Sequence, residues 1–349
     1  MRGLFELAYL LGLEVDRRRK SARARRLPEG KVVSVGNLTA GGTGKTPLVI
    51  MLAGRFFAEA GLCPAVLTRG YKGTLPGPVL ITPGMSASQA GDEPLLIAEK
   101  LKNPGVPVIK GKDRYEAGLY ALRELKPKPG IFILDDGFQH WGLRRDLDIL
   151  ILGASGEDFC PFYQDKLLPV GNLREPPAGI GRADIIVASG IREVPPDFEA
   201  EVRRYNPHAP IFAAWYEAKW VIGAAGGKSK KLKYPPDWLS GREVFAFAGI
   251  GRPESFRRSL LDAGAVIKGF LKFPDHHVFT AAEIDRIRKT AQKNGLEWII
   301  TTEKDIMRLK GDGDKEEKGI YALSVEMQAS PGFFAGILKR IGSEKCSNT

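Results

Sequence analysis

The sequence lacks long apolar runs and has few cysteines. No stretch of 18 or more apolar residues occurs among its 349 residues, so it predicts no membrane-spanning helix. The three cysteines are scattered and form no CxxC pair, which argues against a disulfide framework or a cysteine zinc site and fits a reducing cytosol. Low-complexity tracts are also absent. The composition is that of a globular protein long enough for two domains.

Positive charge is in excess over the whole sequence. Lys and Arg number 52 against 41 Asp and Glu, a net charge of +11, which predicts anionic partners. Nucleic acid is one candidate, but the sequence has no zinc-finger spacing, no aromatic–basic strand of the RNP kind and no basic recognition helix. We therefore expect no nucleic-acid partner, and no obligate protein partner is evident.

The charge is concentrated near the N-terminus, behind an apolar segment. Residues 17–26 contain seven cations and no acid, and apolar residues from Leu4 to Val15 precede them at helical spacing. This is no signal peptide, because Glu6 interrupts the apolar run and most of the positive charge follows it. Such a helix can lie in the headgroup layer of an anionic membrane, or it can dock on the core with a solvated basic tail.

Apolar runs alternate with helical patterns along the rest of the chain. Strands are expected at 31–35, 64–68, 106–109, 131–134, 147–152 and 184–188, with helices at 46–60, 93–102 and 114–125. This alternation predicts an α/β fold with a mostly parallel sheet and helices on both faces.

The pattern changes near residue 211, where alternating aromatic residues up to 222 suggest antiparallel strands. A second α/β pattern begins at Glu243. We therefore expect three parts: a helical, basic segment (1–26), a core domain (27–210), and a two-stranded antiparallel linker with a smaller C-terminal α/β domain (211–349).

A glycine-rich loop lies between the first predicted strand and helix of the core. The strict Walker A pattern requires glycine where this chain has Thr39, but the rest of the pattern is intact. Glycine lets backbone N–H groups turn towards phosphate oxygens, Lys45 can reach the β- and γ-phosphates, and Thr46 offers a hydroxyl to Mg²⁺. The predicted nucleotide-binding residues are Thr39, Ala40, Gly41, Gly42, Thr43, Gly44, Lys45 and Thr46.

An apolar strand at residues 131–134 ends in Asp135 and Asp136. This is the Walker B arrangement, in which a buried strand delivers a carboxylate to Mg²⁺ beside the phosphate loop. We expect Thr46 and one aspartate of the pair to hold Mg²⁺, while the other serves a water or a neighbouring loop. A strand end followed by an Asp-Gly turn is the alternative, which the accompanying phosphate loop disfavours.

Two further segments carry candidate catalytic groups. Asp92 follows Gly91 at the start of a predicted helix, where aspartate is most often a helix cap, although a kinase needs a carboxylate to accept or orient a hydroxyl proton. His276 and His277 are two of only four histidines. They could lie in a surface turn or orient a catalytic carboxylate; a metal site is disfavoured because no third ligand is evident.

Together these segments resemble one family, the tetraacyldisaccharide 4'-kinases of lipid A biosynthesis. The resemblance runs in order through nearly the whole chain. It also implies that a residue other than glycine is usual in that family at the position of Thr39. The matching segments are 35–47, 69–71, 91–94, 112–114, 134–140, 168–176, 273–277 and 301–305.

The resemblance implies ATP- and Mg²⁺-dependent phosphorylation of the 4'-hydroxyl of a tetraacyldisaccharide 1-phosphate, which gives lipid IV-A. It implies a catalytic Asp–His pair, carried onto Asp92 and His276, with His277 as the less favoured partner. Since the pair falls in different predicted domains, we expect domain closure to complete the site. Substrate contacts are expected at Tyr71, Glu93, Arg114, His140, Arg174 and Glu175.

The resemblance also implies a peripheral enzyme on the cytoplasmic face of the inner membrane of a Gram-negative bacterium. Its partners would be the acylated disaccharide 1-phosphate lipid and the anionic membrane surface, which favours the membrane interpretation of residues 1–26. The alternative function is a P-loop ATPase or GTPase switch, such as a metal-insertion chaperone. Such a switch would share the phosphate loop and the Asp135–Asp136 pair but would need neither Asp92 with His276 nor a basic N-terminus.

Overall fold

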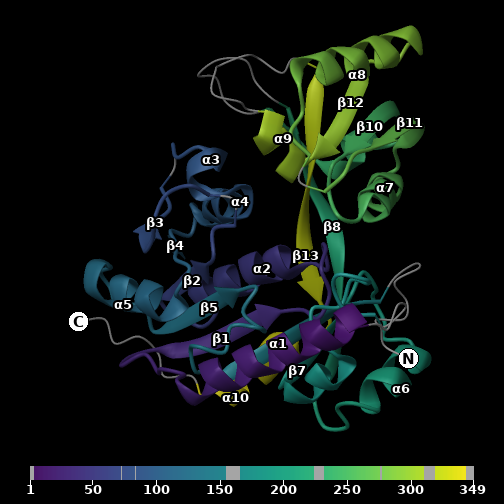
Figure 1. Cartoon of the computed structure of the whole chain (residues 1–349). Helices are drawn as coiled ribbons and strands as arrows, with labels where there is room; N and C mark the ends of the chain where they lie inside the picture. Colours follow the sequence, from purple (N-terminus) through teal and green to yellow (C-terminus); the bar gives the residue numbers. More distant parts are fainter. Residues whose placement is uncertain are drawn as a thin grey trace. The chain divides into compact units, whose positions relative to one another are not determined.

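The structure is a computed structural model that describes residues 4–71, 73–82, 84–154, 166–223, 232–275, 277–309 and 319–342. The chain forms two compact units (Figure 1). The first comprises Met1–Trp215 with Gln328–Thr349, and the second comprises Tyr216–Met327. The second unit is therefore an insertion in the sequence of the first. Strands β8 (Ile211–Gly223) and β13 (Ile320–Ala329) connect the two.

The first unit is built on a mostly parallel sheet with the strand order β8-β7-β6-β1-β5-β2-β4-β3. Strand β3 pairs antiparallel with β4, whereas the neighbouring pairs from β8 through β7, β6, β1, β5 and β2 to β4 are parallel. The central strands are buried along nearly their whole length, which explains their continuous apolar runs. The strands are β1 (Lys31–Gly36), β2 (Pro64–Thr68), β3 (Val79–Leu80), β4 (Val108–Lys110), β5 (Ile131–Asp135), β6 (Leu147–Gly153) and β7 (Ile185–Ser189).

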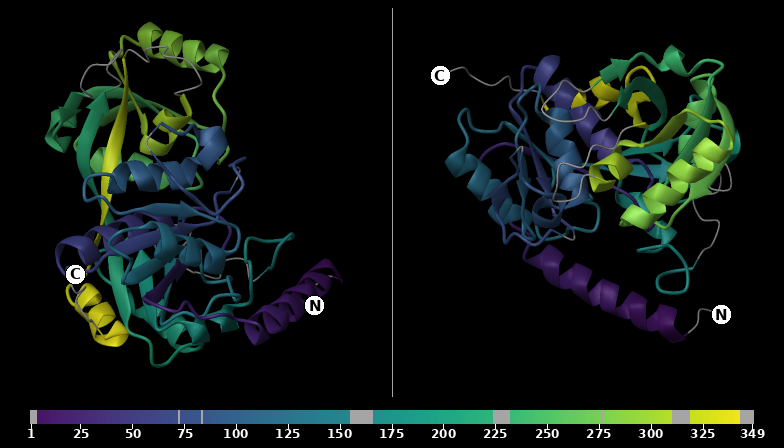
Figure 2. Two further views of the ribbon diagram at one scale, coloured as in Figure 1. Left: turned by 90° about the vertical axis from the view of Figure 1, so that its left-hand side faces the viewer. Right: turned by 90° about the horizontal axis from the view of Figure 1, so that it is seen from above.

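Helices cover both faces of this sheet, as predicted. On one face lie α2 (Lys45–Ala58) and α10 (Phe333–Ile341), whose Phe56 and Phe334 rings are 5.2 Å apart. On the other face, α5 (Arg114–Glu124) and α6 (Pro196–Arg203) pack into the sheet through small and aromatic residues. Helix α1 (Leu4–Ala22) packs on this second face, so α1 and α10 lie on opposite sides of the unit (Figure 2). Helices α3 (Ala87–Ala90) and α4 (Asp92–Leu101) complete the unit, and α4 packs against α2.

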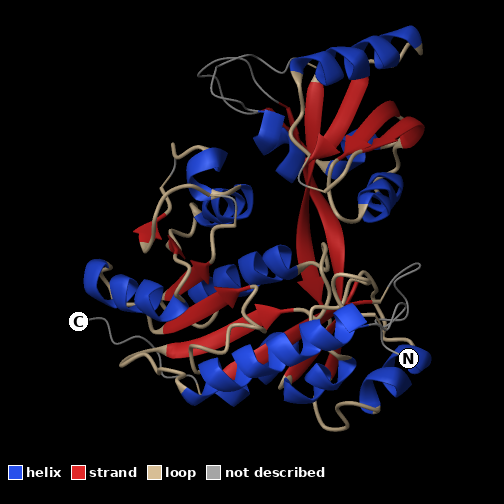
Figure 3. Ribbon diagram, in the orientation of Figure 1, coloured by secondary structure: helices blue, strands red, loops and turns tan. Residues whose placement is uncertain are grey.

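In the second unit the strand order is β11-β10-β12-β13 with parallel pairing, and the order continues from β13 to β8 in the same sheet. Helices and strands alternate along its sequence, and both kinds of element are distinguished by colour in Figure 3. The short strand β9 (Leu232–Tyr234) pairs antiparallel with β8. The other elements are β10 (Glu243–Ala248), α7 (Pro253–Asp262), β11 (Val266–Lys272), α8 (Ala281–Lys293), β12 (Trp298–Thr302) and α9 (Glu303–Leu309).

Residues 17–20 continue α1 as a helical, exposed basic segment in which Glu14 pairs with Arg17 and Arg18. At the other end of the chain the structure differs from the sequence-based expectation. Residues 328–342 belong to the first unit and not to the C-terminal domain, because the apolar face of α10 is buried there. Among the described residues, no helix is long and apolar enough to cross a membrane.

Candidate active site

The glycine-rich loop connects β1 to α2, as the sequence predicts. Gly44 is the N-cap of α2 and has a φ of 98°, a left-handed conformation that glycine adopts without steric cost. Gly41 has a φ of 113° for the same reason. No side chain caps the first turn of α2 in this described segment. The N–H groups of the loop and of this turn therefore form a ready site for an anion such as a phosphate.

Lys45 and Asp136 face each other at this loop. The Lys45 Nζ lies 3.7 Å from Asp136 Oδ1, and burial lowers the pKa of Lys45 while Asp136 opposes that shift. Burial alone would raise the pKa of Asp136, but Lys45 and Arg174 lower it below its ordinary value. Asp136 has a φ of 54°, which is rare for a residue other than glycine and is maintained only where surrounding contacts fix it. Asp136 is therefore an ionised carboxylate that orients Lys45.

Asp135 ends β5 in a different environment. Its carboxylate accepts a hydrogen bond of 3.0 Å from Thr68 Oγ1 at the end of the neighbouring strand β2. Burial, reinforced by the charges of Glu93 and Asp136, raises the pKa of Asp135 to about 7. The charge of Lys45 lowers this pKa but does not outweigh burial and the two neighbouring carboxylates, and a bound cation would add positive charge.

The donor groups fit Mg²⁺ held jointly with a nucleotide. Within the described residues there is no group of three or more His, Cys, Asp or Glu side chains that could hold a metal ion. Mg²⁺ in phosphotransferases commonly takes one or two protein oxygens and fills its octahedral shell with phosphate oxygens and waters. Thr46, which is buried at the start of α2, and the carboxylate of Asp135 are suitable protein donors.

Asp92 is the first residue of α4, and Gly91 is the N-cap. The Asp92 Oδ1 accepts the N–H of Glu93 at 2.9 Å, so its carboxylate does contact the helix start. An added Cβ at Gly91 would come within 2.8 Å of the Tyr71 carbonyl oxygen, which shows how closely the loop after β2 packs there. The charge of Glu93 acts on both Lys45 and Asp135. The start of α4 is therefore part of the phosphate-site region.

Arg114 lies close to the two aspartates, and its charge also acts on His140. The Arg114 guanidinium is buried and donates to the carbonyl oxygens of Gly111, Lys112 and Asp135, and burial lowers its pKa to about 10. It remains a cation at neutral pH. Burial, followed by the charge of Arg114, lowers the pKa of His140 to about 4, so this imidazole is neutral. The His140 Nε2 has no hydrogen-bond partner within the described part of the chain.

Glu175 supports the phosphate loop through other side chains. It is buried, pairs with Arg182 at 2.8 Å and accepts a hydrogen bond of 2.7 Å from Gln139 Nε2. Gln139 also donates to the Asn37 carbonyl, and Asn37 Nδ2 donates to Thr43 Oγ1 at 2.8 Å. Glu175 therefore braces the loop.

Sequence reasoning assigned no role to Thr68, Asn37, Gln139 or Arg182. Asn37 and Gln139 lie inside segments that the sequence already singled out, at 35–47 and 134–140. Thr68 ends a predicted strand, and residues at the ends of adjacent parallel strands meet at one sheet edge. These three could therefore have been found from their position, whereas Arg182 is recognisable only through its long-range contact with Glu175.

The histidine pair lies in the sequence of the second unit. His276 falls outside the described residues, so its pairing with Asp92 stays a prediction. His277 is described: its Nε2 lies 3.1 Å from Glu283 Oε1, and its ring stacks on Phe273 with 4.8 Å between centroids. These contacts fix His277 within its own unit.

The segment Thr302–Asp305, for which the sequence analysis predicts no specific role, anchors the residue that follows β10, Gly249. Asp305 is fully buried and accepts hydrogen bonds from Gly249 N at 3.0 Å and from Thr302 Oγ1 at 2.7 Å. Arg308 pairs with Asp305 at 3.0 Å and also donates to the Gly249 carbonyl. The arrangement satisfies the buried carboxylate within the unit.

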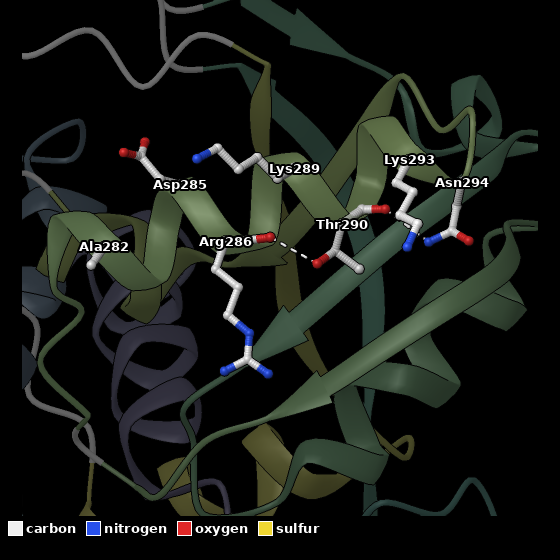
Figure 4. Close-up of a pocket in the computed structure, with 7 residues that line it drawn as sticks. All are labelled: Ala282, Asp285, Arg286, Lys289, Thr290, Lys293 and Asn294. Carbon is white, nitrogen blue, oxygen red and sulfur yellow. Dashed lines mark hydrogen bonds between the residues drawn. The ribbon is translucent and has the colours of Figure 1, made fainter.

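An open depression runs along α8 in the second unit (Figure 4). Two of the side chains that line it hydrogen-bond within the helix: Thr290 to the Arg286 carbonyl and Asn294 to the Thr290 carbonyl. None of the predicted site residues contributes to it, and its exposed cations are those of a solvated helix face. The lining residues are Ala282, Asp285, Arg286, Lys289, Thr290, Lys293 and Asn294.

Comparison with known proteins gives a consistent result. The sequence model of a family described as Tetraacyldisaccharide-1-P 4'-kinase (LpxK) matches residues 2–342. The Tetraacyldisaccharide 4'-kinase of Syntrophus aciditrophicus is 39% identical over 94% of this chain and 88% of its own length, and that of Syntrophobacter fumaroxidans is 41% identical over 88% and 79%. The crystal structure of LpxK from Aquifex aeolicus in complex with ATP superimposes with a TM-score of 0.70 at 33% identity, covering 97% of each chain. The chain belongs to the tetraacyldisaccharide 4'-kinase family.

Proposed function

We propose that this kinase transfers the γ-phosphate of ATP, with Mg²⁺, to the 4'-hydroxyl of a tetraacyldisaccharide 1-phosphate and so forms lipid IV-A. The observation that carries this proposal is the charge arrangement at the phosphate loop. Lys45 lies 3.7 Å from an ionised Asp136, while the adjacent Asp135 is buried without enough positive charge around it. A nucleotide phosphate and a divalent cation complete that balance together.

The chain's own residues divide the work of phosphoryl transfer. The N–H groups of the loop and the ammonium of Lys45 bind the phosphates. Arg174 pairs with Asp136 at 2.7 Å, and Asp136 in turn orients the Lys45 side chain towards the phosphates. Thr46 and Asp135 are the proposed Mg²⁺ ligands. When bound, Mg²⁺ neutralises the charge on the transferring phosphoryl oxygens.

Asp92 is the proposed acceptor of the 4'-hydroxyl proton, with His276 as its partner. His277 is held by Glu283 and Phe273, which supports His276 as the histidine of the pair. Tyr71, Glu93, Arg114 and His140 are the proposed substrate contacts. Arg174 and Glu175, which the sequence grouped with them, are assigned instead to holding Asp136 and Gln139.

The two faces of α1 support a peripheral position on the anionic cytoplasmic face of the inner membrane of a Gram-negative bacterium. Leu7, Leu11 and Val15 form an apolar row that is 50%, 61% and 66% exposed. Cations follow this row in the last turn of the helix, as in helices that lie in a headgroup layer. The opposite face packs on the first unit. Both interpretations made from the sequence are therefore retained: one face of the helix docks on the core, and the other is available to the membrane.

The deciding experiment mixes the protein, γ-labelled ATP, Mg²⁺ and tetraacyldisaccharide 1-phosphate in detergent micelles. We expect label in the lipid product, and no transfer when the 4'-hydroxyl of the acceptor is blocked. Label released only as free phosphate, at a rate independent of the lipid, would overturn the proposal and favour an ATPase switch.

A further inference from the structure

The segment Lys166–Pro176, here called the strap, lies along the entrance of the phosphate loop. The N–H of Arg174 donates to the Leu38 carbonyl oxygen at 2.7 Å, and the N–H of Ala40 donates to the Asn172 carbonyl oxygen at 2.7 Å. Thr39 and Leu173 form an isolated β-bridge between these two contacts. The strap therefore holds residues 38–40, which lead into the glycine-rich turn.

Helix α1 in turn holds the strap near both of its ends. The buried carboxylate of Glu6 accepts the N–H of Leu167 at 3.0 Å. The hydroxyl of Tyr9 donates to the carbonyl oxygen of Arg174 at 2.8 Å. Tyr9 also packs against the buried cluster that contains Leu38 and Leu173. These contacts lie on the face of α1 opposite its exposed apolar row.

Arg174 is the residue where these contacts meet. Its carbonyl oxygen accepts the hydrogen bond from the Tyr9 hydroxyl, and its N–H donates to the Leu38 carbonyl oxygen. Its guanidinium donates to both carboxylate oxygens of Asp136, at 2.7 and 2.8 Å. Asp136 is the carboxylate that faces Lys45. We propose that Tyr9 is a positioning residue for the nucleotide site: through the backbone of Arg174 it sets the Asp136–Lys45 pair and the phosphate loop for ATP.

The inference rests on the nucleotide site of the proposed function but not on the identity of the acceptor. It gives α1 a second role, because the helix that presents the apolar row also fixes the strap. A change in how α1 is held is then transmitted to the ATP site by hydrogen bonds over a short path. At Arg174, the hydrogen bond of this path that comes from α1 is donated by the Tyr9 hydroxyl.

The test is the Tyr9→Phe variant of the full chain, which removes the hydroxyl and keeps the ring. The measurement is the dissociation constant of ATP with Mg²⁺, by calorimetry without lipid acceptor. We expect binding about 3- to 10-fold weaker, the range for loss of one net hydrogen bond. The matched control is Tyr120→Phe on α5, the same chemical change at a partly buried tyrosine outside the strap, for which we expect unchanged binding.

Amide hydrogen exchange separates positioning from general destabilisation. In Tyr9→Phe we expect faster exchange at Ala40 and Arg174, whose N–H groups bridge the loop and the strap, and unchanged exchange in β7. Wild-type ATP affinity in the variant would overturn the inference, as would exchange that rises equally in β7. Because binding is measured without lipid, a chain that fails the phosphotransfer assay but shows these changes disproves only the proposed acceptor.

Discussion

A buried carboxylate lies at the carboxyl end of a parallel strand in each unit; burial raises the pKa of both, but their partners differ. Asp305, just after β12, accepts from Gly249 and Thr302 and pairs with Arg308. Asp135, at the end of β5, has Thr68 as its hydrogen-bond donor and two carboxylates among the groups that raise its pKa to about 7. The second unit neutralises its carboxylate with its own groups. The first unit leaves the charge balance to ligands, which is what a phosphotransfer site requires.

The largest expected effect tests the proposed chemistry at the start of α4. Asp92→Ala should lower turnover by about 10²- to 10⁴-fold while ATP still binds, because a positioned carboxylate contributes on this scale to proton transfer. The measurements are kcat in the lipid assay and the dissociation constant of ATP.

Asp113→Ala is the matched control for Asp92→Ala. Asp113 is the N-cap of α5, where its side chain accepts from the N–H groups of Tyr115 and Glu116. Losing that cap should cost about 1 kcal/mol of stability with little effect on kcat. If Asp92→Ala behaves in the same way, Asp92 is only a helix-start residue.

The next effect concerns Asp135 and pH. In protein free of Mg²⁺, the folded state retains a proton on Asp135 up to a pKa of about 7, whereas the unfolded state loses it near the ordinary value of 3.8. Stability should therefore fall as pH rises from about 4 to 7 and level off above that. Asp135→Asn should remove this fall, as measured by thermal midpoints in EDTA. It should also lower turnover by about 100-fold, because Mg²⁺ loses a ligand.

Subtracting the Asp135→Asn profile from the wild-type profile isolates this carboxyl from other groups, such as His140, that titrate in the same window. Saturating Mg²⁺ with ATP should reverse the trend in the wild type, because the metal binds the ionised carboxylate. A pH profile that is the same in both proteins would contradict the raised pKa of Asp135.

Asp305→Asn should change stability and leave the chemistry intact. An amide cannot fully replace the carboxylate that accepts from Gly249 and Thr302 and pairs with Arg308, so we expect a loss of about 1–3 kcal/mol in the free energy of unfolding. Urea denaturation measures it. If Asp305→Asn instead abolishes the effect of Mg²⁺ on ATP binding, Asp305 takes part in nucleotide binding and the structural role given to it here is wrong.

The smallest effect is expected on the exposed row of α1. Leu11→Ser should weaken binding to anionic phospholipid vesicles about tenfold, because one leucine side chain no longer enters the apolar layer. Co-sedimentation with vesicles measures it, with Leu261→Ser, at an exposed leucine of the second unit, as the control for general hydrophobicity. Equal losses in both variants would leave α1 no special role at the membrane.

The sequence allowed the mostly parallel sheet, the phosphate loop and the Asp135–Asp136 pair to be predicted, because each depends on residues close together in the chain. The contacts that distinguish the two aspartates were not predictable in this way. Thr68 reaches Asp135 across 67 residues, and Arg174 reaches Asp136 across 38. The positive φ of Asp136 also results from such contacts, since nothing in its own residue type requires it.

Helix α10 was not predicted, and the reason is again that its contacts are with residues far away in the sequence. Its apolar residues follow a helical pattern, but their partners lie on α2, about 280 residues earlier in the chain. The role of the Thr302–Asp305 segment likewise depends on Gly249, 56 residues before Asp305. Local pattern identified the segment, and only the fold assigned its contacts.

The return of the chain after residue 327 has a consequence for synthesis. The first unit is completed by its last described residues, where the N–H of Ser330 donates to the Ala213 carbonyl and Phe334 packs on Phe56. During synthesis, the whole inserted unit therefore leaves the ribosome before the nucleotide-binding unit can complete its fold. Until then Phe56 on α2 lacks its partner Phe334, and an exposed aromatic residue favours aggregation. Chains cut short near residue 327 should need chaperones to stay dispersed, although they contain every proposed catalytic residue.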